Sequence, residues 1–319
     1  MAYPGVLCKN GDMPEKCDPS SPVTVTVAVC TRNRARSLKR ALESVLNQAA
    51  DAPGLEILVV DNGDDGETGR VAKSLGARAE GLRLVREPEP GLSAARNRAW
   101  REASGRWIVY IDDDAELVPG YLAALWRLLA EEGDRAGAVG GPIAVGWENN
   151  APGWYEKGLA PWLNSLNLGP ARRRIRWPET LYGTNMAFDA NVLKSLGGFR
   201  GDLGRKGAGL MDAEETELFI RMEKLEGRPV IYDPALKVIH FMTEERLSPG
   251  FFIKKARWHG KSLAALERLH PDKIRGLGNA LWVLASSCFR AVTGRGRGHL
   301  TERVLRASAA GYLYGRFLR

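Results

Sequence analysis

The chain has 319 residues, enough for one large α/β domain with an appendage or for two smaller domains. Its apolar content of 44% and its mixed charges are those of a globular protein and exclude a disordered or fibrous chain. No apolar stretch reaches the roughly 18 residues of a membrane-spanning helix. The net charge of +8 is unevenly placed, because residues 241–319 hold 15 Lys and Arg against 5 Asp and Glu, a net charge of +10.

Residues 1–22 predict an irregular N-terminal arm, since they contain four prolines and few apolar neighbours. This arm lacks the apolar segment of a secretory signal. The four cysteines of the chain do not have the spacing of metal ligands. We therefore expect a reducing, cytoplasmic location.

The first half of the chain alternates between strand and helix patterns. Residues 23–30 form a β-branched run, a helix is predicted from about residue 37, and residues 55–60 predict a second strand that ends in an acidic turn. Further strands are predicted at residues 82–85, 107–111 and 138–145, with helices after residue 91 and at 121–129. This order predicts a doubly wound α/β sheet. Neither a Gly-x-Gly-x-x-Gly turn nor a P-loop is present, which argues against dinucleotide-binding and P-loop proteins.

Three consecutive carboxylates, Asp112, Asp113 and Asp114, follow the strand predicted at residues 107–111. Ligands of open α/β sheets collect at the carboxyl ends of strands. Adjacent aspartates repel each other, and a cation between them relieves the repulsion. Oxygen ligands with no Cys or His nearby favour Mg²⁺ or Mn²⁺. The alternative interpretation is a solvated turn in which Asp114 caps the next helix.

The second half contains two further segments of interest. Residues 181–188 precede a short helix, and a glycine-rich loop at 200–210 precedes the acidic residues 212–217, which open a helix predicted at 218–226. A strand-like segment ends at His240, and the chain beyond it is predicted to be largely helical.

Five segments in this order resemble the motifs of the family 2 glycosyltransferases, which are inverting enzymes. The segments are VAVCTRNRARSLKRALESVLNQ, LEILVVDNGD, GLSAARNRAW with GRWIVYIDDDAEL, GTNMAF, and LMDAEETELFIRMEKLEG. The first segment departs from the family pattern, because Cys30 and Arg32 stand where Pro and an aromatic residue are commoner. The resemblance implies a mixed α/β sheet of the nucleotide-diphospho-sugar transferase (GT-A) type with a helical C-terminal extension.

The resemblance also implies roles for individual residues. Glu215 is expected to be the general base, with Glu214 beside it, because inversion requires a base to take the proton of the acceptor hydroxyl. A divalent cation, Mn²⁺ or Mg²⁺, would offset the charge on the departing nucleoside diphosphate. The expected metal ligands are Asp114, Asp112 and His240; the expected donor-binding residues are Thr31, Asn33, Arg34, Asp61, Arg96, Asp112 and Asp113; and the expected acceptor-binding residues are Gly183, Thr184 and Asn185.

Structural interpretations of the same residues stay open. The two glutamates would complement a helix dipole, a contribution of about 0.3–1 kcal/mol each. His240 would be a buried core residue, and Asp113 would point away from the site if the strand continued. Arg246 would grip the diphosphate if its segment folded over the site.

The predicted organisation has three parts: the arm of residues 1–22, a catalytic domain of residues 23–245 and a basic helical region of residues 246–319. The catalytic domain divides into a nucleotide-sugar-binding half, 23–145, and an acceptor-binding half, 146–245. The basic helices are expected either to lie on an anionic membrane surface, on its cytoplasmic side, or to pack on protein.

The predicted partners are a nucleotide-diphosphate sugar, most simply a UDP-sugar, and a glycan or lipid-linked acceptor used in building the cell envelope. No nucleic-acid-binding motif accompanies the basic tail. The rival functions are a sugar nucleotidyltransferase, which would need a glycine-rich, lysine-bearing loop after the first strand, and a non-catalytic membrane-surface scaffold with a degenerate site.

Overall fold

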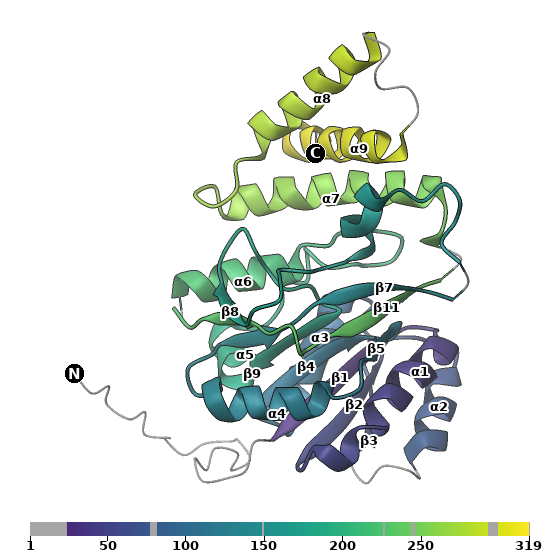
Figure 1. The fold of residues 1–319 in the computed structure, drawn as a ribbon, viewed down its shortest axis with the longest axis vertical. Coiled ribbons are helices and arrows are strands. Elements are labelled where there is room, and N and C mark those ends of the chain that lie inside the picture. The colour runs from purple at the N-terminus through teal and green to yellow at the C-terminus, as the bar shows by residue number, and fades with distance from the viewer. Residues whose placement is uncertain are drawn as a thin grey trace, which may run out of the picture.

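The computed structural model describes residues 24–76, 82–148, 150–225, 227–243, 246–292 and 299–318. The predicted arm of residues 1–22 lies outside these ranges. The described chain forms a body of two sheets and surrounding helices, with three C-terminal helices stacked above it (Figure 1).

The main sheet has eight strands in the order β3-β2-β1-β4-β9-β6-β10-β8. Their bounds are β1 Val25–Thr31, β2 Leu55–Asp61, β3 Leu82–Arg86, β4 Trp107–Asp112, β6 Ala138–Gly140, β8 Arg173–Ile175, β9 Asn185–Asp189 and β10 Val230–Tyr232. The first four strands of this order run parallel, whereas β9 runs antiparallel to both β4 and β6. The sheet is therefore mixed, which confirms the predicted fold class.

A smaller sheet lies beside the carboxyl end of β4. Its strands are β5 Ala115–Leu117, β11 Val238–Met242 and β7 Ile143–Trp147. Strand β11 pairs with β5 through His240 and Ala115, so the chain just after the three aspartates is hydrogen-bonded to the chain around His240. This pairing brings two distant parts of the sequence to one place.

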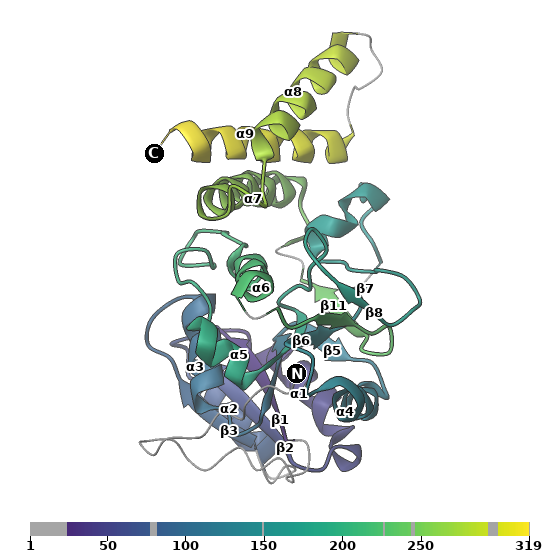
Figure 2. The ribbon, with the colours of Figure 1, turned by 90° about the vertical axis from the view of Figure 1, so that its left-hand side faces the viewer.

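Helices cover both sides of the main sheet (Figure 2), with α3 and α5 on one side and α1 and α4 on the other. Their bounds are α1 Ala35–Leu46, α2 Glu67–Gly76, α3 Leu92–Glu102, α4 Tyr121–Glu132, α5 Ala190–Leu196 and α6 Glu214–Leu225, with 3₁₀ helices η1 Ala49–Asp51 and η2 Lys157–Leu163. The apolar stripe predicted for α1 is buried, because Leu38, Leu42 and Val45 are fully enclosed.

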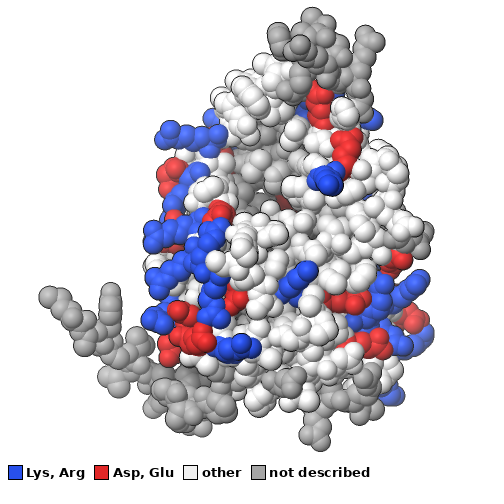
Figure 3. Space-filling view, in the orientation of Figure 1, with Lys and Arg blue, Asp and Glu red and all other residues white. Residues whose placement is uncertain are grey.

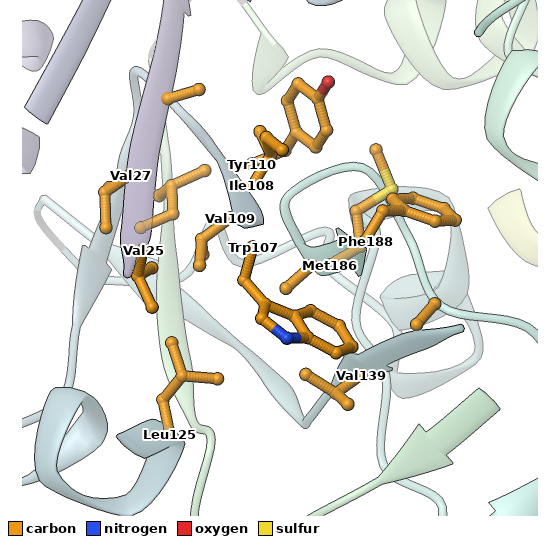
Figure 4. Packing of buried hydrophobic residues seen from close by; sticks show 14 of the residues in the cluster. Val25, Val27, Trp107, Ile108, Val109, Tyr110, Leu125, Val139, Met186 and Phe188 are labelled. Atoms are coloured by element: carbon orange, nitrogen blue, oxygen red, sulfur yellow. The ribbon is translucent and has the colours of Figure 1, made fainter. Parts of the chain in front are cut away.

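The hydrophobic core is centred on strands β1 and β4 (Figure 4). Val25, Val27 and Val109 are fully buried between the helical layers, and Trp107 lies beside Val139 at the amino end of β4. Both strands are apolar on both faces, as expected for strands that are covered on both sides. The polar residues at their carboxyl ends are thus held on a rigid support.

Two predicted elements differ from the structure. The single strand predicted at residues 138–145 is divided into β6 and β7, which belong to different sheets. The division falls at Gly141, where an added Cβ would lie 2.2 Å from the carbonyl oxygen of Leu236, so only glycine fits this bend. Helix α6 begins at Glu214, four residues before the predicted start, which places both glutamates in its first turn.

The chain beyond β11 is helical, as predicted. Helix α7 Pro249–Leu269 lies over the body, α9 Leu300–Phe317 packs along α7, and α8 Gly276–Val292 projects away from both (Figures 1 and 2). Within the described residues, none of the helices is sufficiently long and apolar to cross a membrane.

Candidate active site at the end of strand β4

A cavity of about 470 Å³ opens at the carboxyl ends of β1 and β4. Helix α7 forms one wall, and the start of α6 with the preceding loop forms another. Ten of the predicted site residues line it: Thr31, Arg34, Arg96, Asp112, Asp113, Asp114, Gly183, Thr184, Glu214 and Glu215. Four others, Asn33, Asp61, Asn185 and His240, do not line it. A volume of this size suits a small-molecule ligand.

The three aspartates separate because β4 ends at Asp112. The Asp112 carboxylate faces the cavity and accepts a hydrogen bond of 2.7 Å from Thr184 Oγ1. Asp114 is buried and accepts hydrogen bonds from Arg34 and Arg246, at 2.9 and 2.8 Å. Burial opposes the Asp114 charge, but Arg246 and His240 overcome it and hold the pKa of Asp114 well below its usual range. Asp114 is therefore an anion.

Asp113 turns toward β1 instead of pointing away from the site. Its carboxylate accepts hydrogen bonds from Thr31 Oγ1 at 2.7 Å and from Arg34 Nη1 at 3.1 Å. Burial and the neighbouring Asp114 raise the pKa of Asp113 to about 6. The prediction that it would face the opposite side assumed that the strand continued, and this was wrong because a turn follows Asp112.

His240 lies directly behind Asp114. Its Nε2 is 3.0 Å from Asp114 Oδ1, and its Nδ1 is 3.0 Å from the carbonyl oxygen of Leu163. Asp112, Asp114 and His240 each offer one ligand atom, and these three atoms lie within 4.8 Å of one another. Two carboxylate oxygens and an imidazole nitrogen suit Mn²⁺, and the carbonyl beyond His240 fixes the orientation of its ring as in metal sites. The donor set therefore fits a divalent cation.

Glu214 and Glu215 meet Arg96 of α3 at the opposite side of the cavity. Glu214 is buried and accepts a hydrogen bond of 2.8 Å from Arg96 Nη1. Burial, followed by the charge of Glu215, raises the pKa of Glu214 well above its usual value. Arg96 is predicted to reach the donor, yet its guanidinium is held by Glu214 and lies 3.5 Å from Asp112.

Glu215 is less enclosed than Glu214, with 14% against 2% of its side chain exposed, and its Oε2 lies 3.8 Å from Arg96 Nη1. Its Oε1 accepts a long hydrogen bond of 3.4 Å from the Gly183 amide, and its Oε2 has no hydrogen-bond partner within the described chain. Gly183 itself is required, since an added Cβ would lie 2.0 Å from Arg96 Nη2. A carboxylate at a cavity wall that accepts only one long hydrogen bond can take a proton from a ligand.

The predicted residues that do not line the cavity have definite partners. Asn33 has a φ of 55° and holds the Asp64 amide through its side-chain oxygen at 3.0 Å. Asp61 ends β2 and accepts a hydrogen bond of 2.9 Å from the Gly63 amide. Asn185 is fully buried, and its amide group bonds to Tyr121 and to the carbonyls of Leu236 and Pro142. Asn185 therefore braces the β9 strand rather than facing a ligand.

Several residues of the cavity wall were not predicted. Lys255 and His259 project from α7, Asp212 precedes α6, Arg205 comes from a loop, and Trp162 belongs to η2. Lys255 and His259 are four residues apart, a spacing that places both on one helix face. This spacing was the available signal, but the sequence alone does not show which face of α7 meets the cavity.

Comparison with known proteins identifies related sequences. A protein-family model described as glycosyl transferase family 2 matches residues 26–197, more than half of the chain. A glucosyl-dolichyl phosphate glucuronosyltransferase of Haloferax volcanii is 28% identical over 250 residues, covering 78% of this chain and 79% of that protein. The succinoglycan biosynthesis protein ExoM of Rhizobium meliloti is 26% identical over 280 residues, covering 84% of this chain and 81% of that protein.

Two solved structures share the fold. A mannosyltransferase from Pyrobaculum calidifontis in complex with GDP-Man and Mn²⁺ has a TM-score of 0.60 at 22% identity, covering 93% of this chain and 89% of its own. GalNAc-T7 with UDP, GalNAc and Mn²⁺ has a TM-score of 0.53 at 18% identity, covering 75% of this chain and 48% of its own.

Proposed function

The chain belongs to glycosyl transferase family 2 and is a glycosyltransferase of the GT-A fold; from this premise we propose that it transfers a sugar with inversion from a nucleotide-diphosphate sugar to an acceptor hydroxyl. One observation carries the proposal. The carboxylate of Glu215 borders the same cavity as Asp112 and Asp114, and the hydrogen bond that it accepts from the Gly183 amide is long, at 3.4 Å. An acid–base group and a diphosphate-binding group thus face one ligand.

The donor is assigned to the side of the aspartates. Asp112, Asp114 and His240 would hold Mn²⁺ or Mg²⁺, which supplies positive charge against the departing nucleoside diphosphate when bound. Arg34 and Arg246, which already bind Asp114, add fixed positive charge there. Thr31, Asn33, Asp61 and Asp113 would shape the donor pocket, and the similar structures with GDP-Man and with UDP support a nucleotide-sugar donor.

The acceptor is assigned to the side of Glu215, with Gly183 and Thr184 nearby. The oxygen of an acceptor hydroxyl would attack the anomeric carbon as the bond from this carbon to the diphosphate breaks. Glu215 would take the hydroxyl proton, and the diphosphate would leave with the bonding electrons. Arg96 and Glu214 would position Glu215, and Asn185 would brace β9 behind Thr184.

The C-terminal helices suggest where the acceptor comes from. Leu281 and Trp282 of α8 and Phe317 of α9 are exposed, and Arg303 and Arg316 are exposed on α9. We assign these helices to an anionic membrane surface on the cytoplasmic side, with a lipid-linked or glycan acceptor of the cell envelope. The name of the Haloferax relative, which includes a dolichyl phosphate, supports a lipid-linked acceptor.

The test is release of nucleoside diphosphate from a panel of UDP-, GDP- and dTDP-sugars, with Mn²⁺, with Mg²⁺ and with EDTA. We expect one donor to be cleaved only when metal is present. Asp114→Ala should lower the rate by about 10²–10³-fold, the range seen when one charge-stabilising group is lost. Glu215→Gln should lower it by about 10²–10⁴-fold, since a general base contributes that much.

Asp134→Ala is the matched control, because this carboxylate is 90% exposed and lies away from the cavity. The proposal is wrong if the wild type neither cleaves nor binds any donor in a metal-dependent way, or if Asp114→Ala behaves like the control. The first outcome would favour a scaffold with a degenerate site.

A further inference from the structure

The wall of the cavity formed by α7 carries cations that the proposed transfer does not use. Lys255 and His259 lie one helical turn apart on α7, and Arg205 reaches the same cavity from the loop before α6. These residues lie beyond residues 26–197, which the family model matches. Their surroundings indicate what they bind.

Lys255 is 7% exposed and has no anionic partner in contact. Its Nζ donates hydrogen bonds to the Trp162 carbonyl oxygen at 2.7 Å and to Asn164 Oδ1 at 2.9 Å, both neutral groups. No described carboxylate forms an ion pair with it. Burial lowers the pKa of Lys255 to about 7. A buried ammonium without a counterion is destabilising, and such groups are characteristic of binding sites.

Arg205 and His259 extend this positive region. The side chain of Arg205 makes neither an ion pair nor a hydrogen bond with any described residue, unlike Arg34 and Arg246, which bind Asp114. His259 Nδ1 lies 3.2 Å from both oxygens of Asp212. Burial opposes a charge on His259, but Asp212 overcomes it and raises the pKa of His259. Asp212 thus favours the charged form of the ring, and the ring Nε2 is left for a ligand.

This wall is on the acceptor side of the cavity. His259 of this wall contacts Asp212, which lies two residues before the first residue of α6, and Asp212 and Glu215 are the carboxylates whose charges favour the Lys255 ammonium. Trp162 lies in edge contact with His259, at 5.4 Å between ring centroids, and supplies an apolar surface beside the cations. A ligand bound here would place its neighbouring hydroxyl near Glu215 rather than near Asp114.

We propose that Lys255, Arg205 and His259 form a subsite for a phosphate group of the acceptor, so that the enzyme uses a phosphorylated acceptor. The proposal rests on the proposed function, because it uses Glu215 as the base. Phosphate chemistry has two sources in this reaction, the acceptor and the diphosphate of the donor. The position beside Glu215 assigns the subsite to the acceptor.

In the experiment, phenyl phosphate is titrated into enzyme that is already saturated with nucleoside diphosphate and Mn²⁺, and calorimetry measures its binding. The wild type should bind phenyl phosphate in this loaded state. Lys255→Met and Arg205→Met should each weaken binding by about tenfold or more, the loss expected for one charge-assisted hydrogen bond. Arg205→Met keeps the test decisive if Lys255→Met does not fold, since Arg205 is a half-buried loop residue.

Matched controls are Lys254→Met and Lys206→Met, which remove exposed charges next to the two positions and should bind phenyl phosphate like the wild type. The proposal is overturned if phenyl phosphate binds only to enzyme that lacks nucleoside diphosphate, or if Lys255→Met and Arg205→Met match the controls. It is also overturned if both variants weaken nucleoside diphosphate binding equally, because the cations would then serve the donor. Failure of the proposed function would appear separately, as absent metal-dependent donor binding.

Discussion

Glu214 and Glu215 are neighbours in sequence with different surroundings. Glu214 is buried against Arg96, and burial with the charge of Glu215 raises its pKa well above the usual value. Glu215 lines the cavity, is less enclosed, and accepts only a long hydrogen bond from the Gly183 amide. Two carboxylates whose environments differ in this way can serve different purposes. The assignment of Glu215 as the base and Glu214 as a positioning residue is therefore an argument from environment, beside the resemblance.

Lys255 provides a prediction about stability at the scale of one residue. Its pKa is about 7 in the folded protein and near its ordinary value of 10.5 when unfolded. Between these values the unfolded chain binds more protons than the folded one, so this group makes stability rise with pH. The Tm of Lys255→Met minus the Tm of the wild type should therefore fall from pH 7 to pH 10.

Thermal unfolding of both proteins in a phosphate-free buffer measures this difference. The charged groups that face Lys255 are Arg205, Arg246, Asp212, Glu215 and His259, and they are unchanged in the variant. Lys254→Met is the control on the exposed face of the same helix. A Tm difference that stays constant across this range would show that the pKa of Lys255 is not lowered in the folded protein.

At the scale of elements, α7 and α9 cross with their backbones in contact. An added Cβ on Gly311 of α9 would lie 2.1 Å from the Arg257 carbonyl oxygen, and one on Gly260 of α7 would lie 2.0 Å from that of Ser308. Glycine is costly inside a helix. Its presence on both helices at the crossing is explained by this close approach.

Gly311→Ala should therefore lower the Tm of the protein, because the helices must separate to admit the new methyl group. Overpacking costs about 1–3 kcal/mol, which exceeds the gain in helix propensity of about 1 kcal/mol. Gly278→Ala on α8 is the matched control, since nothing lies within 4 Å of its added Cβ and the position is exposed. Gly278→Ala should leave Tm unchanged or raise it. A Tm for Gly311→Ala at or above that of the control would contradict the close contact of the α7 and α9 backbones.

The elements were predictable where their signals are local. The strands at β1, β2 and β4 and the helix α1 follow from apolar periodicity, because a strand or an amphipathic helix is recorded in neighbouring residues. The division of the strand at Gly141 was not predictable. It depends on the carbonyl of Leu236, which is far away in sequence.

At the scale of the whole molecule, the site too was predictable only where its signals are local in the sequence. The aspartates were located because three carboxylates at the end of a strand are a local pattern. The ion pair of Arg96 with Glu214 joins residues 118 positions apart, so the sequence alone did not indicate it. The wall of α7 could not be foreseen, since the sequence does not say where a helix packs.

Helices α7 and α9, which carry many of the Lys and Arg residues of the C-terminal quarter, are stacked above the catalytic body (Figure 1). In the view of Figure 3, Lys and Arg are interspersed with Asp and Glu along both flanks. Helices α8 and α9 also carry exposed apolar side chains. Leu281 and Trp282 are 52% and 66% exposed on α8, and Phe317 is 62% exposed at the end of α9. Apolar side chains beside arginines suit an anionic lipid surface.

We therefore expect the protein to sediment with vesicles that contain phosphatidylglycerol, and less with vesicles of phosphatidylcholine alone. Binding should weaken as salt is raised, because the attraction of arginines to anionic lipid is screened. Trp282→Ser should reduce the bound fraction, since the indole would no longer enter the lipid interface. Leu225→Ser on α6 is the control, because Leu225 is 70% exposed but lies on the catalytic body. Equal binding of both variants, or no binding to anionic vesicles at low salt, would assign the exposed faces of α8 and α9 to a protein partner instead.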